Sequence, residues 1–221
     1  MAHRLCDQVS FCLTGGRAVF LDARADRYVC LTGGANTAFR DLLDQGFTAG
    51  VGLDGLVRAR LLEEVDTEPP PIRPALAQSA RLSLTEQVSA KTAFAIGDVL
   101  EAGRQLVGAR SRLKQRAFSI NMDELRARKA RLGPDAATPC DPLMGFTKVF
   151  NAARRMVPVK PVCLLDSLAL LDFLARRRLS ADLVFGVKLN PFAAHCWVQA
   201  GDTVLNEAIE RVRLHTPILV V

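Results

Sequence analysis

The sequence predicts an α+β protein of two unequal parts. Short strand-like runs open it, a proline-rich segment interrupts it, and helices followed by strands fill the remainder. The chain has 221 residues, of which 49% are hydrophobic and 24% are charged, close to the average of globular proteins. We therefore expect folded domains with a buried core rather than a disordered chain.

The first part predicts a small winged-helix-like unit with a three-stranded antiparallel sheet. Three short runs have strand character: Val9–Leu13, in which apolar and polar residues alternate, Ala18–Asp22 and Arg27–Leu31. The Gly15-Gly16 pair between the first two is typical of a hairpin turn. Apolar residues at helical spacing then predict two short helices, over Asn36–Leu43 and Asp54–Glu64.

The charge of this first part disfavours DNA binding, a common function of winged-helix units. Residues 1–75 hold 8 Lys and Arg against 10 Asp and Glu, a net charge of −2, whereas residues 76–221 hold 21 against 13, a net charge of +8. A short meander leaves an open sheet edge, to which an extended peptide can add as a further strand. We expect peptide capture here and no nucleic acid, with a purely structural appendage as the alternative.

The segment Glu68–Pro74 predicts a linker, because its four prolines favour extended backbone and remove hydrogen-bond donors. It divides the chain into a first domain over residues 1–67, a linker over 68–74 and a second domain over 75–221.

The second part predicts helices first and strands afterwards. Ser83 and Glu86 have the spacing of a helix capping box. The expected helices are Ala75–Ala80, Ser83–Leu106, Arg110–Leu132, Phe146–Met156 and Leu164–Arg178, the last with a single apolar stripe, and the expected strands are Ala181–Lys188, Ala194–Ala200, Thr203–Asn206 and Pro217–Val221.

Several classes of protein are disfavoured by what the sequence lacks. The longest apolar stretch, Val162–Leu171, is interrupted by Asp166, so no membrane span is expected, and without a secretion signal at its start the chain is expected in the cytoplasm. Six cysteines without a CxxC pair and three histidines without metal-site spacing predict no metal and no cofactor. The basic run Arg110–Arg131 is either a solvated helix face or a surface for an anionic partner.

Cys163 and His195 are the candidate catalytic pair. Cys163 starts an apolar helix, where backbone amides and the helix dipole favour a thiolate. On the predicted strand, alternation places His195 with Trp197 on one face and Cys196 on the other, so that His195 and Cys196 are not expected to face the same partner. A cysteine on a helix facing a histidine on a strand is the arrangement of thiol proteases. The alternative is that both are core residues.

A third group is expected to orient the imidazole, and the candidates are Asp202 and Glu207. A three-residue turn over residues 200–202 would pair residue 195 with residue 207, so we favour Glu207. A two-residue turn would shift this register and turn Glu207 away. Asp202 at the tip is typical of a turn former.

These residues carry a resemblance. The runs PVCLLDSLALLDFLARRR and ADLVFGVKLNPFAAHCWVQAGDTVLNE resemble the transglutaminase-like cysteine peptidases that remove leader peptides in lasso peptide biosynthesis. The resemblance implies a papain/transglutaminase-like α+β domain with the triad Cys163, His195 and Glu207. The family usually has aspartate in place of Glu207 and alanine in place of Cys196. The Cys163 amide, at the helix start, is the expected oxyanion donor.

The first part, through VFLDARADRYVCLTGGANTAFRDLL, resembles the small PqqD-like domains that recognise precursor peptides. The resemblance implies that the leader docks beside the third strand, at Arg27, Tyr28, Val29, Cys30 and Leu31. It also implies two partners, the lasso precursor peptide and an asparagine-synthetase-like cyclase. Two alternatives stay open: a transglutaminase-like acyl transferase, in which an amine replaces water, and a non-catalytic peptide-binding adaptor.

Overall fold

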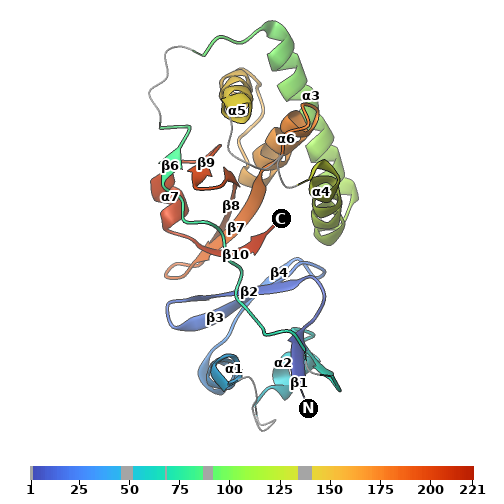
Figure 1. Ribbon diagram of the computed structural model, residues 1–221, viewed down its shortest axis with the longest axis vertical. Coiled ribbons are helices and arrows are strands. Elements are labelled where there is room, and N and C mark those ends of the chain that lie inside the picture. The colour runs from blue at the N-terminus through green and yellow to red at the C-terminus, as the bar shows by residue number, and fades with distance from the viewer. Residues whose placement is uncertain (1, 46–51, 68, 87–91, 134–140) are drawn as a thin grey trace.

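The computed structural model describes residues 2–45, 52–67, 69–86, 92–133 and 141–221. Figure 1 shows two lobes stacked along the longest axis of the molecule, with the N-terminal strands and small helices in one and all later helices in the other. The predicted α+β class is confirmed. The division at residues 68–74 and the PqqD-like assignment of the first part stay predictions.

The predicted meander is present. Strands β2 (Val9–Thr14), β3 (Arg17–Asp22) and β4 (Arg27–Cys30) form an antiparallel sheet in the order β2-β3-β4. Thr14 pairs with Arg17 across a turn in which Gly15 and Gly16 have φ of 56° and 74°. Positive φ at both positions is the type I′ turn, whose twist matches that of the flanking strands and which glycine adopts without strain, so it explains the glycine pair. The strand order places β4 at an edge of the sheet.

Both faces of this sheet are buried. Phe11 and Phe20 face helix α1 (Gly33–Gln45) and pack against Phe39, with ring centroids 5.0 and 4.8 Å from it. Cys12 and Val19 point the other way and belong to the same apolar cluster as the core of the second lobe. Strand β10 (Thr216–Val220) packs on β2, so the two lobes share a core rather than hanging on a tether.

One predicted helix of the first lobe is wrong in part. The segment predicted helical over Asp54–Glu64 forms only the short helix α2 (Asp54–Arg58) and then strand β5 (Leu62–Val65), which pairs antiparallel with β1 (Ala2–Leu5). Arg60, with φ of 56°, breaks the helix between them. Burial of Leu61 and Leu62 is compatible with a helix or with a strand. Residues 62–65 form a strand because β1, at the N-terminus, is available to pair with them.

The helix predicted over Ala75–Ala80 is wrong, and the helix predicted over Ser83–Leu106 is correct only from Ile96 onward. Residues 71–81 have no regular secondary structure, the Ala75 amide donates to the Phe11 carbonyl over 2.9 Å, and Leu82–Ser83 forms strand β6. Ser83 makes no helix cap; its hydroxyl donates to the Glu207 carbonyl over 2.7 Å instead. Helix α3 begins at Ile96, and residues 87–91 of the predicted helix lie outside the described residues.

The second lobe contains a five-stranded sheet and several helices, which pack around helix α6 (Cys163–Ala175). With β10 and β6, the sheet contains β7 (Asp182–Lys188), β8 (Ala193–Ala200) and β9 (Thr203–Val204). The strand order is β10-β7-β8-β9-β6, and neighbouring strands are antiparallel except for β6 beside β9. Almost every residue from Leu165 to Leu174 is buried, so the helix that carries Cys163 is enclosed rather than apolar along one stripe. The remaining elements are α3 (Ile96–Gln115), α4 (Phe118–Leu132), α5 (Asp141–Arg154) and α7 (Ile209–Arg213).

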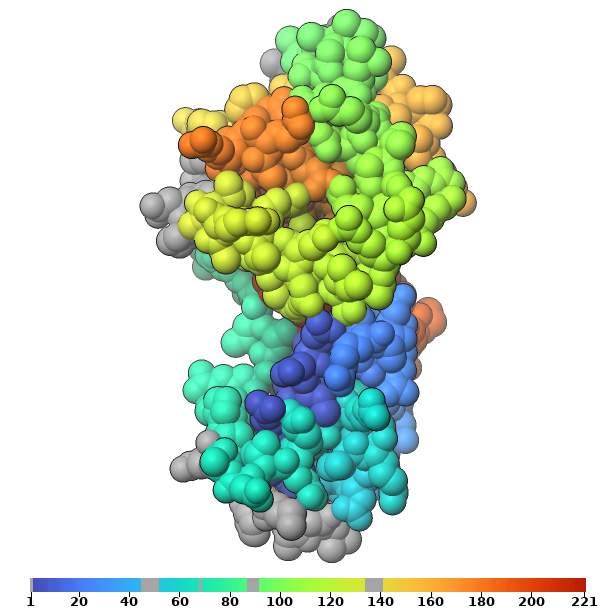
Figure 2. Space-filling view, turned by 90° about the vertical axis from the view of Figure 1, so that its right-hand side faces the viewer, coloured from blue at the N-terminus to red at the C-terminus, as the bar shows by residue number. Residues whose placement is uncertain are grey.

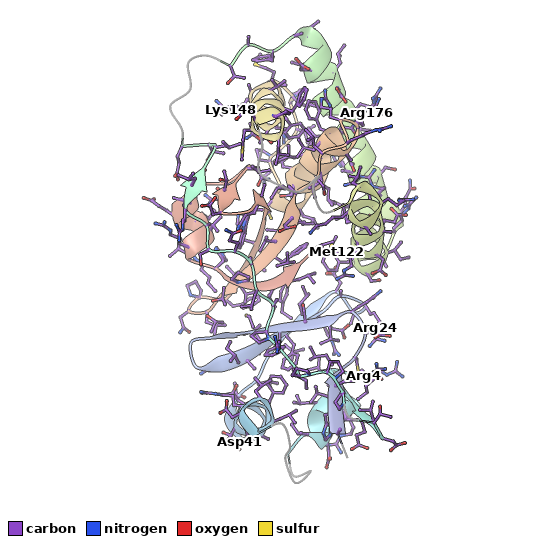
Figure 3. All side chains as sticks on the ribbon, in the orientation of Figure 1. Arg4, Arg24, Asp41, Met122, Lys148 and Arg176 are labelled. Carbon is purple, nitrogen blue, oxygen red and sulfur yellow. The ribbon has the colours of Figure 1, made fainter. Side chains whose placement is uncertain are left out.

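The basic run predicted as one helix over Arg110–Leu132 is broken between α3 and α4. Arg112 and Arg128 both pair with the buried Asp172 of α6, and Lys129 pairs with Asp182. Three of the basic side chains that were considered for an anionic partner are therefore paired with carboxylates of the protein itself. Figure 3 shows Arg24, Lys148 and Arg176 projecting outward, whereas Met122 of α4 points inward.

The lobes meet at a narrow waist. Figure 2 shows atoms of α3 and α4 close-packed over the N-terminal strands there. The side-chain amide of Gln8 donates to Asp123 of α4 over 2.6 Å across this junction. Among the helices that the structure describes, none is long and apolar enough to cross a membrane.

Candidate active site

Cys163 is the first residue of helix α6. Val162 before it is extended, and no side chain caps the helix, so the first amides of α6 are left for another acceptor. Arg154 fixes the preceding loop: its guanidinium donates to Asp166 over 2.8 Å and to the carbonyls of Val157 and Val159 over 3.2 and 2.9 Å. The loop and the first turn of α6 are thereby held together.

His195 lies on β8, and Glu207 follows β9. The His195 Nε2 and Glu207 Oε2 atoms are 2.7 Å apart. A carboxylate only accepts, so Nε2 carries the proton of this bond and Nδ1 is left for the thiol. The second oxygen of Glu207 accepts the Ala208 amide over 2.9 Å, which fixes the carboxylate. The structure thus brings Cys163, His195 and Glu207 together.

The predicted register behind Glu207 is wrong, although the residue is adjacent to the ring. Ala200 pairs with Thr203, so the turn has two residues and not three. Glu207 still reaches His195 because the ladder ends at Val204 and the chain leaves the sheet. Asp202 is at the turn, where it accepts a hydrogen bond from the Thr203 hydroxyl over 3.2 Å.

Asn206 connects the strand of His195 to the helix of Cys163. Its side-chain oxygen accepts the Val198 amide over 2.8 Å, and its side-chain nitrogen donates to the buried Ser167 hydroxyl over 3.0 Å. These two bonds set the spacing of β8 and α6. The sequence pattern predicts only that Asn206 lies in a strand, and no motif in the sequence indicates a role for Asn206 or Arg154 at the site.

Gly186 lies opposite His195 in the β7–β8 pairing. A Cβ atom at this position would lie 2.8 Å from two ring carbons of Trp197 and 2.9 Å from the Cβ of His215. Glycine therefore makes room for Trp197 beside the imidazole, whose ring centroid is 6.4 Å from that of Trp197. His215, 5.5 Å from His195 between ring centroids, donates from Nδ1 to the Arg211 carbonyl over 2.8 Å.

The electrostatics favour a thiolate and imidazolium pair. Hydrogen bonds from the Cys196 side chain and His195 outweigh burial and lower the pKa of Cys163 to about 4. Burial opposes the imidazolium, but the bonds to Cys163 and Glu207 prevail and raise the pKa of His195 to about 9. Burial also opposes the Glu207 carboxylate, yet its bonds to His195 and the Ala208 amide lower its pKa overall. The Cys163 thiol is therefore expected to be a thiolate at neutral pH.

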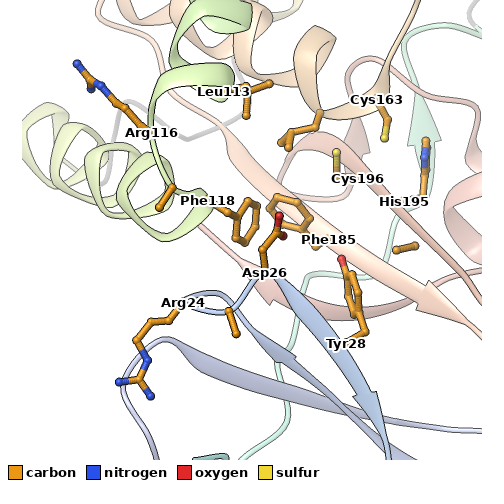
Figure 4. Close-up of a pocket in the computed structure, with 14 residues that line it drawn as sticks. Arg24, Asp26, Tyr28, Leu113, Arg116, Phe118, Cys163, Phe185, His195 and Cys196 are labelled. Carbon is orange, nitrogen blue, oxygen red and sulfur yellow. The ribbon is translucent and has the colours of Figure 1, made fainter.

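The expectation that Cys196 and His195 face different partners is wrong. Both line the cavity that contains Cys163, and Figure 4 shows the two sulfur atoms directed toward each other. The contact with Cys163 raises the pKa of Cys196 well above its ordinary value, so Cys196 stays a neutral donor. Alternation along β8 does not predict this contact, because Cys163, the first residue of α6, lies close to the Cys196 backbone as well as to the side chains of Cys196 and His195.

Four of the predicted leader-binding residues, Arg27, Tyr28, Val29 and Cys30, form the edge strand β4, and Leu31 follows it. Among the described residues, β4 pairs with β3 alone and its other edge has no strand beside it. Val29 and Leu31 pack into the core of the first lobe, whereas Tyr28 and Cys30 pack toward the second. Arg27 binds Asp22 over 3.3 Å and the Ala59 carbonyl over 2.8 Å.

Comparison with known proteins identifies the second lobe. Residues 104–220 match the model of the transglutaminase-like superfamily. The chain belongs to this superfamily. A 49-residue stretch, 22% of the chain, is 45% identical to the microcin J25-processing protein McjB of Escherichia coli and spans 24% of that protein's length. No solved structure gives a significant match. In the part of the chain that the structure describes, no cluster of three His, Cys, Asp or Glu side chains could hold a metal ion.

Proposed function

We propose that this protein is a cysteine peptidase that removes the leader from a ribosomally made lasso precursor peptide. Cys163 is the nucleophile, His195 its general acid and base, and Glu207 the group that orients the imidazole. The observation that carries the proposal is the 2.7 Å bond between His195 and Glu207, which leaves the other ring nitrogen for the thiol. The similarity to a protein named for processing microcin J25 supports the substrate class.

The reaction follows from these positions. The Cys163 thiolate attacks the scissile carbonyl, and a C–S bond forms while the carbonyl oxygen takes the negative charge near the uncapped amides of α6. The His195 imidazolium gives its proton to the departing nitrogen, and the C–N bond breaks. The neutral imidazole then takes a proton from water, and the water oxygen attacks the thioester carbonyl and forms a C–O bond. The C–S bond breaks, the leader leaves as a carboxylic acid that loses its proton to solvent, and the Cys163 thiolate and His195 imidazolium are regenerated.

The leader is proposed to bind at the open edge of β4 as an added strand, through main-chain hydrogen bonds. Because the lobes share a core, a leader on β4 is held at a fixed place relative to Cys163. The scissile bond is then presented at high effective concentration, and the catalytic lobe needs few contacts with the released peptide.

The released core peptide is proposed to pass to an asparagine-synthetase-like cyclase, which closes the ring. This protein would then supply the free amine that such a reaction consumes.

The experiment is incubation of the purified protein with its precursor peptide and measurement of product masses. We expect wild-type protein to give two fragments whose masses total the precursor plus one water, and Cys163→Ala to give none. Glu207→Gln and Asp202→Asn form a matched pair, since each replaces one of the two candidate carboxylates by an amide. We expect Glu207→Gln to lose most activity and Asp202→Asn to keep it.

Other outcomes identify the alternatives. A product in which an added amine is joined to the leader, without hydrolysis, would indicate an acyl transferase. Leader binding without any cleavage, together with slow alkylation of Cys163 at neutral pH, would indicate a peptide-binding adaptor.

A further inference from the structure

The cavity at Cys163 is built by both lobes. It has a volume of about 420 Å³ and is lined on one side by Arg24, Asp26 and Tyr28 of the first lobe. Leu113, Phe118 and Phe185 of the second lobe form the apolar wall opposite, and Cys163, His195 and Cys196 close one end (Figure 4). A pocket of this size and composition is typical of a site that binds part of a peptide or a small molecule.

Tyr28 is directed into this cavity. In Figure 4 its hydroxyl points toward the end of the cavity that holds Cys163 and His195. Its ring packs against Phe192, which precedes β8, with centroids 5.6 Å apart. Among the described residues that line the cavity, Tyr28 supplies the one phenolic or aliphatic hydroxyl.

The position of Tyr28 is fixed by the packing of the lobes. Its neighbours on the same face of the sheet, including Val19 and Leu21, are buried in the cluster that contains the core of the second lobe. The phenol stays protonated near neutral pH, because burial and the nearby Cys196 and Cys163 raise the pKa of Tyr28 to about 12. A neutral, immobilised hydroxyl is a donor that needs no reorganisation during a reaction.

We propose that Tyr28 is a catalytic residue contributed by the first lobe: its hydroxyl donates a hydrogen bond to the scissile carbonyl oxygen, together with the Cys163 amide. The apolar wall of Leu113, Phe118 and Phe185 then receives an apolar side chain of the substrate next to the scissile bond. This inference rests on the proposed peptidase function. The first lobe therefore completes the active site in addition to binding the leader.

The first test uses Tyr28 as a unique probe, since it is the single tyrosine of the chain. Protein labelled with 3-fluorotyrosine should give one fluorine resonance. Carboxamidomethylation at pH 6, where Cys163 is the thiol with a lowered pKa, should shift this resonance in wild-type protein and leave it unshifted in Cys163→Ala. An unshifted resonance in the alkylated wild-type protein would overturn the placement of Tyr28 at the nucleophile, whether or not the protein cleaves peptides.

The second test is Tyr28→Phe, which removes the hydroxyl and keeps the ring. One oxyanion donor is worth on the order of 100-fold in kcat, so we expect kcat to fall about 10- to 100-fold with KM within about twofold. Affinity for the isolated leader and the alkylation rate of Cys163 should stay unchanged, as should all values for the exposed Asp41→Asn control on α1.

The outcomes separate the two proposals. If wild-type protein cleaves and Tyr28→Phe has the same kcat, the role of Tyr28 is overturned and the peptidase stands. If wild-type protein cleaves nothing, the peptidase is overturned, and so is the role of Tyr28 in cleavage; the fluorine shift then decides only its place in the cavity. Precursor variants with a charged residue in place of an apolar one beside the scissile bond should be cleaved at least tenfold more slowly.

Discussion

Replacing Cys196 by alanine should raise the pKa of the nucleophile. The Cys196 side chain is the largest of the influences that lower the pKa of Cys163 to about 4. A hydrogen bond to a charged group is worth about 1.5–3 kcal/mol, and one pKa unit corresponds to about 1.4 kcal/mol. The loss of this bond therefore predicts a Cys163 pKa of about 5–6 in Cys196→Ala. The imidazolium of His195 remains, so the pKa should stay below that of a free thiol.

The assay is the pH dependence of alkylation of Cys163 by iodoacetamide, followed by mass spectrometry from pH 3.5 to 8. The same measurement on Cys163→Ala gives the background from the other thiols. Cys196→Ser is the control of similar size, because its hydroxyl can still donate to the thiolate, and its midpoint should lie between those of the other two proteins. A midpoint in Cys196→Ala that equals the wild-type value would refute the reasoning that the Cys196 thiol stabilises the thiolate.

Three further results are expected. Gly186→Ala should overpack the site against Trp197 and destabilise the fold by about 1–3 kcal/mol, seen as a lower Tm and as altered fluorescence of this single tryptophan. Asn206→Ala should leave the Val198 amide without its acceptor, lower stability by about 1–3 kcal/mol and reduce kcat, and an unchanged Tm would show that this bond is unimportant. The rate of cleavage should have a bell-shaped dependence on pH. It should rise near pH 4, where Cys163 loses its proton, and fall near pH 9, where His195 loses its proton. A rate that still rises at pH 9 would contradict this expectation.

The sequence predicts the elements whose signals are local. The short apolar runs joined by Gly15-Gly16 predict the meander correctly, because the geometry of a two-residue turn and the pairing of the strands beside it depend on neighbouring residues. The spacing of Ser83 and Glu86 predicts a helix cap that does not form, because both side chains bind residues far away in the sequence. The Ser83 hydroxyl donates to the Glu207 carbonyl, and the Glu86 carboxylate accepts the Ile209 amide. Leu61 and Leu62 fit a helix or a strand equally well, and only pairing with β1 decides.

The candidate site shows the same division. The placement of Cys163 at a helix start follows from the prolines before it and the apolar run after it, and His195 lies on a strand with a clear pattern. The proximity of Cys196 and Tyr28 to Cys163 depends on how α6 and the first lobe pack against β8. No spacing along the chain encodes that packing, so these contacts become visible only in three dimensions.

Glu207 lies beside His195 as predicted, but the register from which this was predicted is wrong. With a two-residue turn, strict continuation of the ladder would place residue 208, not 207, opposite His195. The chain avoids this because the side chain of Asn206 replaces the backbone partner of Val198, which ends the pairing and frees Glu207 to turn toward the ring. Ser83 then holds the Glu207 carbonyl from the far side. The acidic residue and the bonds that end the ladder therefore form one unit, and substitution of either should displace the carboxylate from His195.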